Sequence, residues 1–160
     1  MAEGSNGWRF AGAALLVAAV LGLGVAGCGG GDSEGATVSV YVAAQLCAGA
    51  KAELASHGAT ANHFKVAARC LAPSERSGGG VDLSTNGANS RRATEDTSAV
   101  ATLEAPGPGN KFTRSILETA GIPLVRSASG RSGMKLVIEA VESAGTSNVR
   151  GSVEETLEPT

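Results

Sequence analysis

The sequence contains few aromatic residues, and this scarcity limits the partners that it is expected to bind. Tryptophan, tyrosine and phenylalanine make up 3% of its 160 residues, and beyond residue 27 only Tyr41, Phe64 and Phe112 remain. The 13 basic and 15 acidic residues nearly cancel, which leaves a formal net charge of −2 and no basic stripe. Single-stranded nucleic acids are held by stacked aromatic rings and positive grooves, so we expect no nucleic-acid partner.

The sequence also lacks the residue groupings that mark common enzymes. Its two histidines, His57 and His63, fall where a helix end and a turn are expected, and neither accompanies a serine or cysteine in a nucleophile elbow. The glycine run at 78–80 is not followed by the lysine and helix start that a phosphate-binding loop requires. We therefore expect neither an enzymatic activity nor a cofactor.

A long apolar run occurs only near the N-terminus, from Phe10 to Gly24, directly after the positively charged Arg9. This run is too short to span a bilayer comfortably and is typical of a signal peptide. Val25–Cys28 (VAGC) follows at once and resembles the lipobox of bacterial lipoproteins, which implies cleavage before Cys28 and a lipid on its thiol. An ordinary secretory signal and an uncleaved anchor are the alternatives.

This leader predicts the layout of the whole chain. Residues 1–27 are expected to be a signal peptide, residues 28–36 a lipidated polar tether, and residues 37–160 a single domain. Two or three acyl chains hold a protein on a membrane, because each buried methylene contributes about 0.8 kcal/mol. We therefore expect an extracytoplasmic protein that is anchored to the cell membrane through Cys28.

The stretch Ser98–Ser129 reads as a strand, a helix and a second strand. Ala99–Leu103 is a short apolar run, and a turn rich in proline and glycine then leads to Asn110, which we expect to cap a helix that ends at Gly121. Ile122–Val125 is apolar enough to be a second buried strand. Two strands joined by one helix run parallel with a right-handed crossover, so the stretch predicts a βαβ unit.

The rest of the chain continues this alternation of strands and helices. We expect strands at 37–44 and 64–71, and helices at 45–57, from Ser84 to about Asp96, at 134–144, and after Asn148. This order predicts an α/β fold that is doubly wound, with a mainly parallel sheet of about four strands and helices on both faces.

Two cysteines of the expected domain lie where neighbouring strands would bring them together. Cys47 follows the first expected strand, and Cys70 lies near the end of the second. Outside the cytoplasm such a pair can oxidise to a disulfide. Two separate buried thiols, or a metal pair with His57 and His63, are the alternatives, although the spacing lacks the close ligand pair of usual zinc sites.

In open α/β sheets, ligands bind beyond the carboxyl ends of the strands, so both loops of Ser98–Ser129 are candidates for a ligand site. The first loop leads into a helix N-terminus, where free N–H groups favour an anion, and the second loop supplies hydroxyl groups. The candidate ligand-binding residues are Glu104, Gly109, Asn110, Ser127 and Ser129. A plain surface loop is the alternative.

Three segments carry a resemblance to a known family: VSVYVAAQL at 38–46, NSRRATEDTSAVATLEAPGPGNKFTRSILETAGIPLVRSAS at 89–129, and GMKLVIEAVESAG at 133–145. In this order they resemble the leucine/isoleucine/valine-binding type of ABC-transporter solute-binding lipoprotein, which has the type 1 periplasmic-binding fold. The resemblance implies a small amino acid as ligand and ABC permease subunits as partners. The chain lacks a segment for a second lobe, so we expect a single-lobe, shortened member.

The leading hypothesis is therefore a membrane-anchored lipoprotein related to the branched-chain amino-acid-binding component of ABC uptake systems. The alternative is a binding-incompetent single lobe that serves as a structural or protein-interaction module, with a homodimer as one such assembly. Glu104 bears on this choice, because its carboxylate would repel the carboxylate of an amino acid.

Overall fold

The structure is a computed structural model, and it describes residues 35–76, 78–145 and 148–157. The expected signal peptide, the expected lipid attachment site Cys28 and most of the expected tether lie outside the described residues. The last two tether residues are paired with the chain that follows them. Gly35 donates its N–H to the carbonyl of His63 over 2.9 Å, and the carbonyl of Ala36 accepts the N–H of Lys65 over 2.9 Å.

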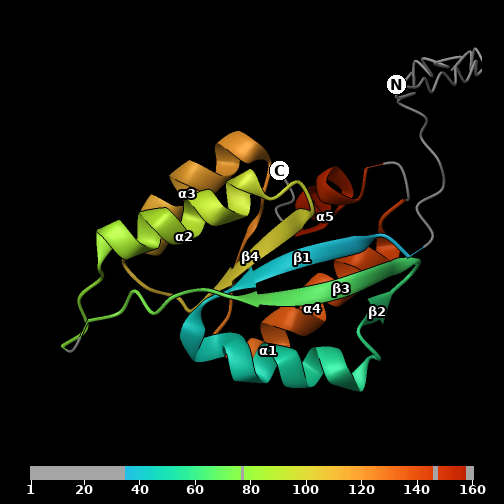
Figure 1. Cartoon of the computed structure of the whole chain (residues 1–160), viewed down its shortest axis with the longest axis horizontal. Coiled ribbons are helices and arrows are strands. Elements are labelled where there is room, and N and C mark those ends of the chain that lie inside the picture. Colours follow the sequence, from blue (N-terminus) through green and yellow to red (C-terminus); the bar gives the residue numbers. More distant parts are fainter. Residues whose placement is uncertain (1–34, 77, 146–147, 158–160) are drawn as a thin grey trace, which may run out of the picture.

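The described residues form an α/β fold in which five strands make a mostly parallel sheet that packs against five α-helices (Figure 1). The strands are β1 (Thr37–Val42), β2 (Thr60–Ala61), β3 (Phe64–Cys70), β4 (Ala99–Glu104) and β5 (Leu124–Arg126). The helices are α1 (Ala44–Ser56), α2 (Leu83–Glu95), α3 (Asn110–Leu117), α4 (Gly130–Ser143) and α5 (Val149–Leu157), with a 3-10 turn at Glu118–Ala120. The predicted α/β class with a mainly parallel sheet is confirmed.

The strand order is β2-β3-β1-β4-β5, and every neighbouring pair except β2 and β3 runs parallel. The sequence predicts about four strands, and β2, which pairs antiparallel with the start of β3, is an additional one. Ala59 and Asn62 flank β2 with positive φ angles of 56° and 53°, which reverse the chain sharply. Two residues are too few to show an alternating pattern in the sequence, so β2 is recognised only from its pairing with β3 in the folded chain.

The central strands follow their sequence patterns closely. In β1, Val38, Val40 and Val42 are buried in the larger core, while Ser39 and Tyr41 face the other side of the sheet. All six residues of β4 are buried, as expected for a parallel strand that is covered on both faces. The apolar run that suggested this strand therefore lies at the centre of the molecule.

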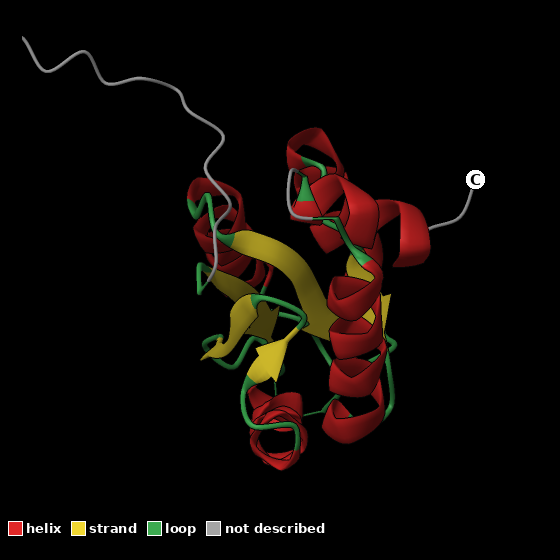
Figure 2. Ribbon diagram, turned by 90° about the vertical axis from the view of Figure 1, so that its right-hand side faces the viewer, coloured by secondary structure: helices red, strands yellow, loops and turns green. Residues whose placement is uncertain are grey.

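Helices cover both faces of the sheet, as Figure 2 shows. Helices α1, α4 and α5 pack together on one face around the larger core cluster. Helices α2 and α3 pack together on the other face, over a smaller cluster that includes Leu117, Ile122 and Leu124. Among the described helices, none is long and apolar enough to cross a membrane.

Helices α1 and α4 approach each other closely at Gly130. A Cβ atom added to Gly130 would collide with the backbone carbonyl oxygen of Leu46, and it would lie 2.8 Å from the backbone nitrogen of Ala50. Backbone atoms of a helix cannot move aside as a side chain can, so this crossing requires glycine. The contact fixes the start of α4 against the first turns of α1.

Three helices begin at residues other than those suggested by the sequence. Asp82, and not Ser84, caps α2, because its Oδ1 accepts the N–H groups of Ser84 (3.0 Å) and Thr85 (3.3 Å). Gly109 takes the capping position of α3, and α4 begins at Gly130, four residues earlier than expected. The expected cap of the last helix is confirmed, since the Asn148 side chain accepts the N–H of Gly151 over 3.1 Å.

Candidate binding pocket at the carboxyl edge of the sheet

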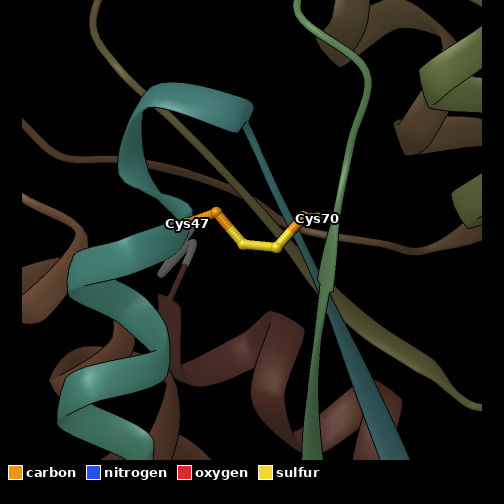
Figure 3. The surroundings of a disulfide bond; sticks show 2 residues. All are labelled: Cys47 and Cys70. Atoms are coloured by element: carbon orange, nitrogen blue, oxygen red, sulfur yellow. A yellow bond between two sulfur atoms is a disulfide. The ribbon is translucent and has the colours of Figure 1, made fainter.

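A disulfide joins Cys47 in the first turn of α1 to Cys70 at the end of β3 (Figure 3). Their Cα atoms are 5.6 Å apart, and 23 residues separate them in the chain. The prediction of a disulfide is confirmed, and the alternatives of free thiols and a metal pair are wrong for these two residues. On the chain-entropy model a loop of this size gains about 3 kcal/mol of stability.

The disulfide lies at the edge of the sheet where the order of the parallel strands reverses. From β1 the chain crosses one face through α1 to β3, and from β3 it crosses the opposite face through α2 to β4. The carboxyl ends of these strands point to the left in Figure 1. Crevices at such a reversal are the usual ligand sites of open α/β sheets.

A pocket of about 300 Å³ occupies this position. Its walls come from the segments that follow β1, β3 and β4, together with one side of α2. The polar residues that line it include Gln45, Glu75, Asn86, Asn89, Glu104 and Asn110. A small cavity with a few convergent polar groups is the usual form of a small-molecule site.

Glu104, the last residue of β4, is the most buried charged residue that lines the pocket, with 9% of its surface exposed. Asn110 donates its Nδ2 to Oε2 of Glu104 over 2.7 Å, and the hydroxyl of Thr113 donates to Oε1 over 3.1 Å. Burial raises the pKa of the Glu104 carboxyl above its ordinary value, and these two hydrogen bonds oppose that rise. The carboxyl group is thus held in place by neutral donors.

Asn110 also shapes the loop that follows β4. Its Nδ2 donates to the carbonyl of Ala105 over 3.1 Å, and its Oδ1 accepts the N–H of Gly107 over 2.7 Å. The residue expected to cap α3 therefore bonds instead to the preceding loop and to Glu104. This corrects the predicted role of Asn110, which bridges β4 and the proline- and glycine-rich loop.

Two buried asparagines on α2 complete the inner wall of the pocket. Asn86 donates its Nδ2 to the hydroxyl of Thr113 over 3.0 Å, which extends the chain of hydrogen bonds to Glu104. Asn89 grips the backbone of Ala72 from both sides, donating to its carbonyl over 2.8 Å and accepting its N–H over 3.3 Å. The loop after β3 is thereby fastened to α2.

Asn86, Asn89 and Thr113 are not among the predicted ligand-binding residues, although the sequence of α2 carries a signal for two of them. The buried positions of α2 are Asn86, Gly87, Asn89, Ser90 and Ala93, which repeat at helical spacing and carry mostly polar side chains. A helix that turns a polar stripe toward the sheet must satisfy it with buried hydrogen bonds. The scarcity of apolar residues in the sequence of α2 therefore indicates that this helix buries polar side chains.

The outer rim of the pocket carries a second set of polar contacts. Gln45, at the start of α1, donates its Nε2 to Oε1 of Glu75 over 2.8 Å. Arg76 lies beside Asp82, with 3.6 Å between Nη2 and Oδ1, and its side chain is 66% exposed. A short antiparallel bridge between Glu75 and Val81 brings both ends of this loop together.

The structure brings three of the five predicted ligand-binding residues together. Glu104, Gly109 and Asn110 line the pocket. Ser127 and Ser129 do not, because they follow β5, which lies on the far side of β4 from β1. Their polar groups bond to each other, with the Ser127 hydroxyl donating to the carbonyl of Ser129 over 2.9 Å.

The histidines lie away from this pocket. The ring of His57 contacts Glu53 one turn earlier on α1, with 3.7 Å between Nδ1 and Oε1, and His63 is exposed after β2. In the part of the chain that the structure describes, no group of three or more His, Cys, Asp and Glu side chains could hold a metal ion.

Comparison with known proteins adds no relative to this picture. A scan against protein-family models, a search of curated proteins and a search of solved structures each found no match to this chain.

Proposed function

We propose that this chain is an extracytoplasmic lipoprotein, held on the cell membrane through Cys28, whose single α/β domain binds a small solute for an ABC-type uptake system. The observation that carries the proposal is the pocket at the carboxyl ends of β1, β3 and β4, with the buried Glu104 in its wall. Open α/β sheets bind their ligands at such a reversal of strand order.

Two further features support this proposal. The parallel strands follow the order β3-β1-β4-β5, and the late helix α4 packs back against α1 beside the first strand. This arrangement fits one lobe of a type 1 periplasmic-binding fold, in which a late segment returns to the first lobe. The lipobox at Val25–Cys28 fits the anchored form of such binding proteins.

The pocket is walled by one domain only, so we propose that it binds solutes more weakly than a site enclosed by two closing lobes. A ligand that is buried on one side keeps part of its hydration and forms fewer contacts. Weak binding, in the range of micromolar to millimolar dissociation constants, is expected on these grounds.

Isothermal titration calorimetry of the purified protein with leucine, isoleucine, valine and other small amino acids tests the solute-binding proposal. Saturable heat, or an increase in melting temperature at millimolar solute, would support it. The absence of both for a broad panel of amino acids, amines and sugars would contradict it.

A second candidate function is a protein-interaction module, and exposed apolar side chains on α2 and α3 favour it. Leu83 is 55% exposed and Phe112 is 39% exposed, and the ring of Phe112 lies over Gly87, one helical turn after Leu83. Exposed apolar side chains that lie together often mark contacts with other proteins. Sedimentation that reveals a concentration-dependent dimer, lost in Phe112→Ser, would support this second function.

A further inference from the structure

Glu104 presents a buried carboxyl group to the pocket, next to Arg126 in the register of β4 and β5. It is nine-tenths buried, and its two hydrogen-bond donors, Asn110 and Thr113, are both neutral. Removing a carboxylate from water is costly unless a positive charge or a full set of donors replaces the lost hydration. The observed donors replace only part of it, because a carboxylate offers about four acceptor positions.

The neighbouring amide groups have little left to offer a ligand. Asn110 uses its Nδ2 on Glu104 and Ala105, and Asn86 uses its Nδ2 on Thr113. Both the Nδ2 and the Oδ1 of Asn89 form hydrogen bonds with the backbone of Ala72. The side-chain amide donors of the inner wall are therefore largely used, which favours a ligand that itself donates hydrogen bonds to the wall.

The charges of the pocket lead to the same conclusion. The charged residues that line it are Glu75, Arg76 and Glu104, so two negative charges face one positive charge. Arg76 is already beside Asp82 and points largely to solvent, whereas Glu75 lies next to Gln45 at the N-terminus of α1. The N-terminus of α1 would by itself attract an anionic group of a ligand. Glu75 lies beside that N-terminus, so its carboxylate would repel the same group.

We propose that the pocket binds a small organic ammonium ion that has no carboxylate of its own, and that the ammonium group donates hydrogen bonds to Glu104. This inference rests on the proposed function, since it names the class of solute that the same pocket would take. Leu71, Val81, Pro106 and Pro108 also line the pocket and offer contact to a short apolar tail. The volume of about 300 Å³ restricts that tail to a few carbon atoms.

Four compounds of nearly equal shape test this class by calorimetry and thermal shift on the purified protein. They are 3-methylbutylamine, leucine, 4-methylpentanoate and 3-methylbutanol, which carry an ammonium group, both charges, a carboxylate and no charge respectively. We expect the amine to bind at least tenfold more tightly than each of the others. Tighter or equal binding of leucine, the acid or the alcohol would overturn the inference while leaving solute binding intact. No binding of any of the four compounds would overturn the inference, and the absence of binding across the broader panel of amino acids, amines and sugars would overturn the proposed function as well.

A charge-neutral variant tests the role of Glu104 directly. Glu104→Gln should weaken binding of the amine at least tenfold and leave any binding of 3-methylbutanol unchanged. Glu139→Gln is the matched control, because Glu139 is exposed on α4 beside Lys135, away from the pocket, and should bind the amine as the unaltered protein does. Equal amine affinity in Glu104→Gln would overturn the inference.

A second measurement avoids the risk that the variant does not fold. Carbon-13 NMR of the Glu side-chain carboxyls in the unaltered protein should show the Glu104 titration moving to lower pH when the amine is bound. The neighbouring elements present Arg126 on β5, Glu75 and Arg76 on the loop after β3, and the neutral Asn86 and Thr113 on α2 and α3. A Glu104 titration that stays in place at saturating amine would overturn the inference.

Discussion

Arg150 on α5 donates its Nε to the backbone carbonyl of Ala99, the first residue of β4, over 2.7 Å. Its Nη2 also donates to the carbonyls of Asp96 (3.1 Å) and Thr97 (2.9 Å), and Nη1 reaches the carbonyl of Ala120 at 3.4 Å. One guanidinium thus satisfies carbonyl groups from the end of α2, the start of β4 and the 3-10 turn. It fastens the last described helix to the amino edge of the sheet.

We therefore expect Arg150→Ala to destabilise the domain by about 1.5–3 kcal/mol, the range for hydrogen bonds that involve a charged group. Arg150→Lys should recover only part of this loss, because an ammonium group cannot reproduce the planar fork of donors. Equilibrium urea unfolding measures both. Lys51→Ala, at an exposed position of α1, is the control and should change the free energy of unfolding little. If Arg150→Ala lowers the free energy of unfolding no more than the control does, the hydrogen bonds of Arg150 do not stabilise the domain.

The disulfide should contribute about 3 kcal/mol to stability through the loop that it closes. The paired variant Cys47→Ser/Cys70→Ser should lose this amount in urea unfolding, and a reducing agent should lower the stability of the unaltered protein but not of the variant. Thiol counting on denatured Cys28→Ser protein checks the bond itself. It should find no free thiol before reduction and two afterwards, and two thiols before reduction would refute the pairing.

Glu104 should make the domain more stable as the solution becomes mildly acidic. Its pKa is raised in the folded state, so its contribution is fully present below the ordinary value of 4.5 and is lost as the pH rises through the folded value. Asp82 and Asp96 act in the opposite direction, since their pKa values are lowered mainly by hydrogen bonds from Thr85 and Ser98 respectively. A variant is needed to separate these contributions.

The measurement compares the free energy of unfolding of Glu104→Gln with that of the unaltered protein at pH 4 and at pH 7.5. The unaltered protein should gain stability relative to the variant at the lower pH. The reason is that protonation of a carboxyl with a raised pKa favours the folded state, whereas the glutamine of the variant cannot be protonated. Glu142→Gln, at an exposed position of α4, should show no such difference between the two pH values. A difference of opposite sign for Glu104→Gln would show that its pKa is not raised.

Cys28→Ser should abolish metabolic labelling with a radioactive fatty acid and release the protein from the membrane fraction. The reason is that the thiol of Cys28 is the proposed site of the diacylglycerol, and without it no acyl chain holds the protein on the bilayer. Ser33→Ala, in the same polar segment, should keep both labelling and membrane association. Undiminished labelling of Cys28→Ser would disprove the anchor.

Most of the fold could be read from local patterns. The apolar run at 99–103, the alternation at 37–42 and the helical spacing of Leu136, Val137, Ala140 and Val141 each lie within one element, and each predicted its element. Leu136 is the exception in its helix, because 46% of its surface is exposed. Such patterns record which side of a strand or helix is buried, and this information needs no knowledge of the neighbours. Errors arose at boundaries, as for Asp82 at the start of α2, where two adjacent polar residues compete to cap one helix.

The pocket could be read only in part. Its place at the carboxyl edge, and Glu104, Gly109 and Asn110, follow from the βαβ unit and the general rule for open sheets. The inclusion of Asn86 and Asn89, and the exclusion of Ser127 and Ser129, depend on which strand lies next to β1. Strand order is a property of the assembled sheet and leaves little trace in any single segment.

The sequence by itself therefore determined the α/β class and the parallel crossover, and it favoured the pairing of Cys47 with Cys70, because each arises from a pattern or proximity along one or two neighbouring elements. Tertiary structure alone decided that the polar stripe of α2 faces inward, that Asn110 bonds to Glu104 rather than capping its helix, and that Arg150 spans three elements. These contacts join groups distant in the chain, so only the folded packing, which must satisfy most buried donors and acceptors, could select them.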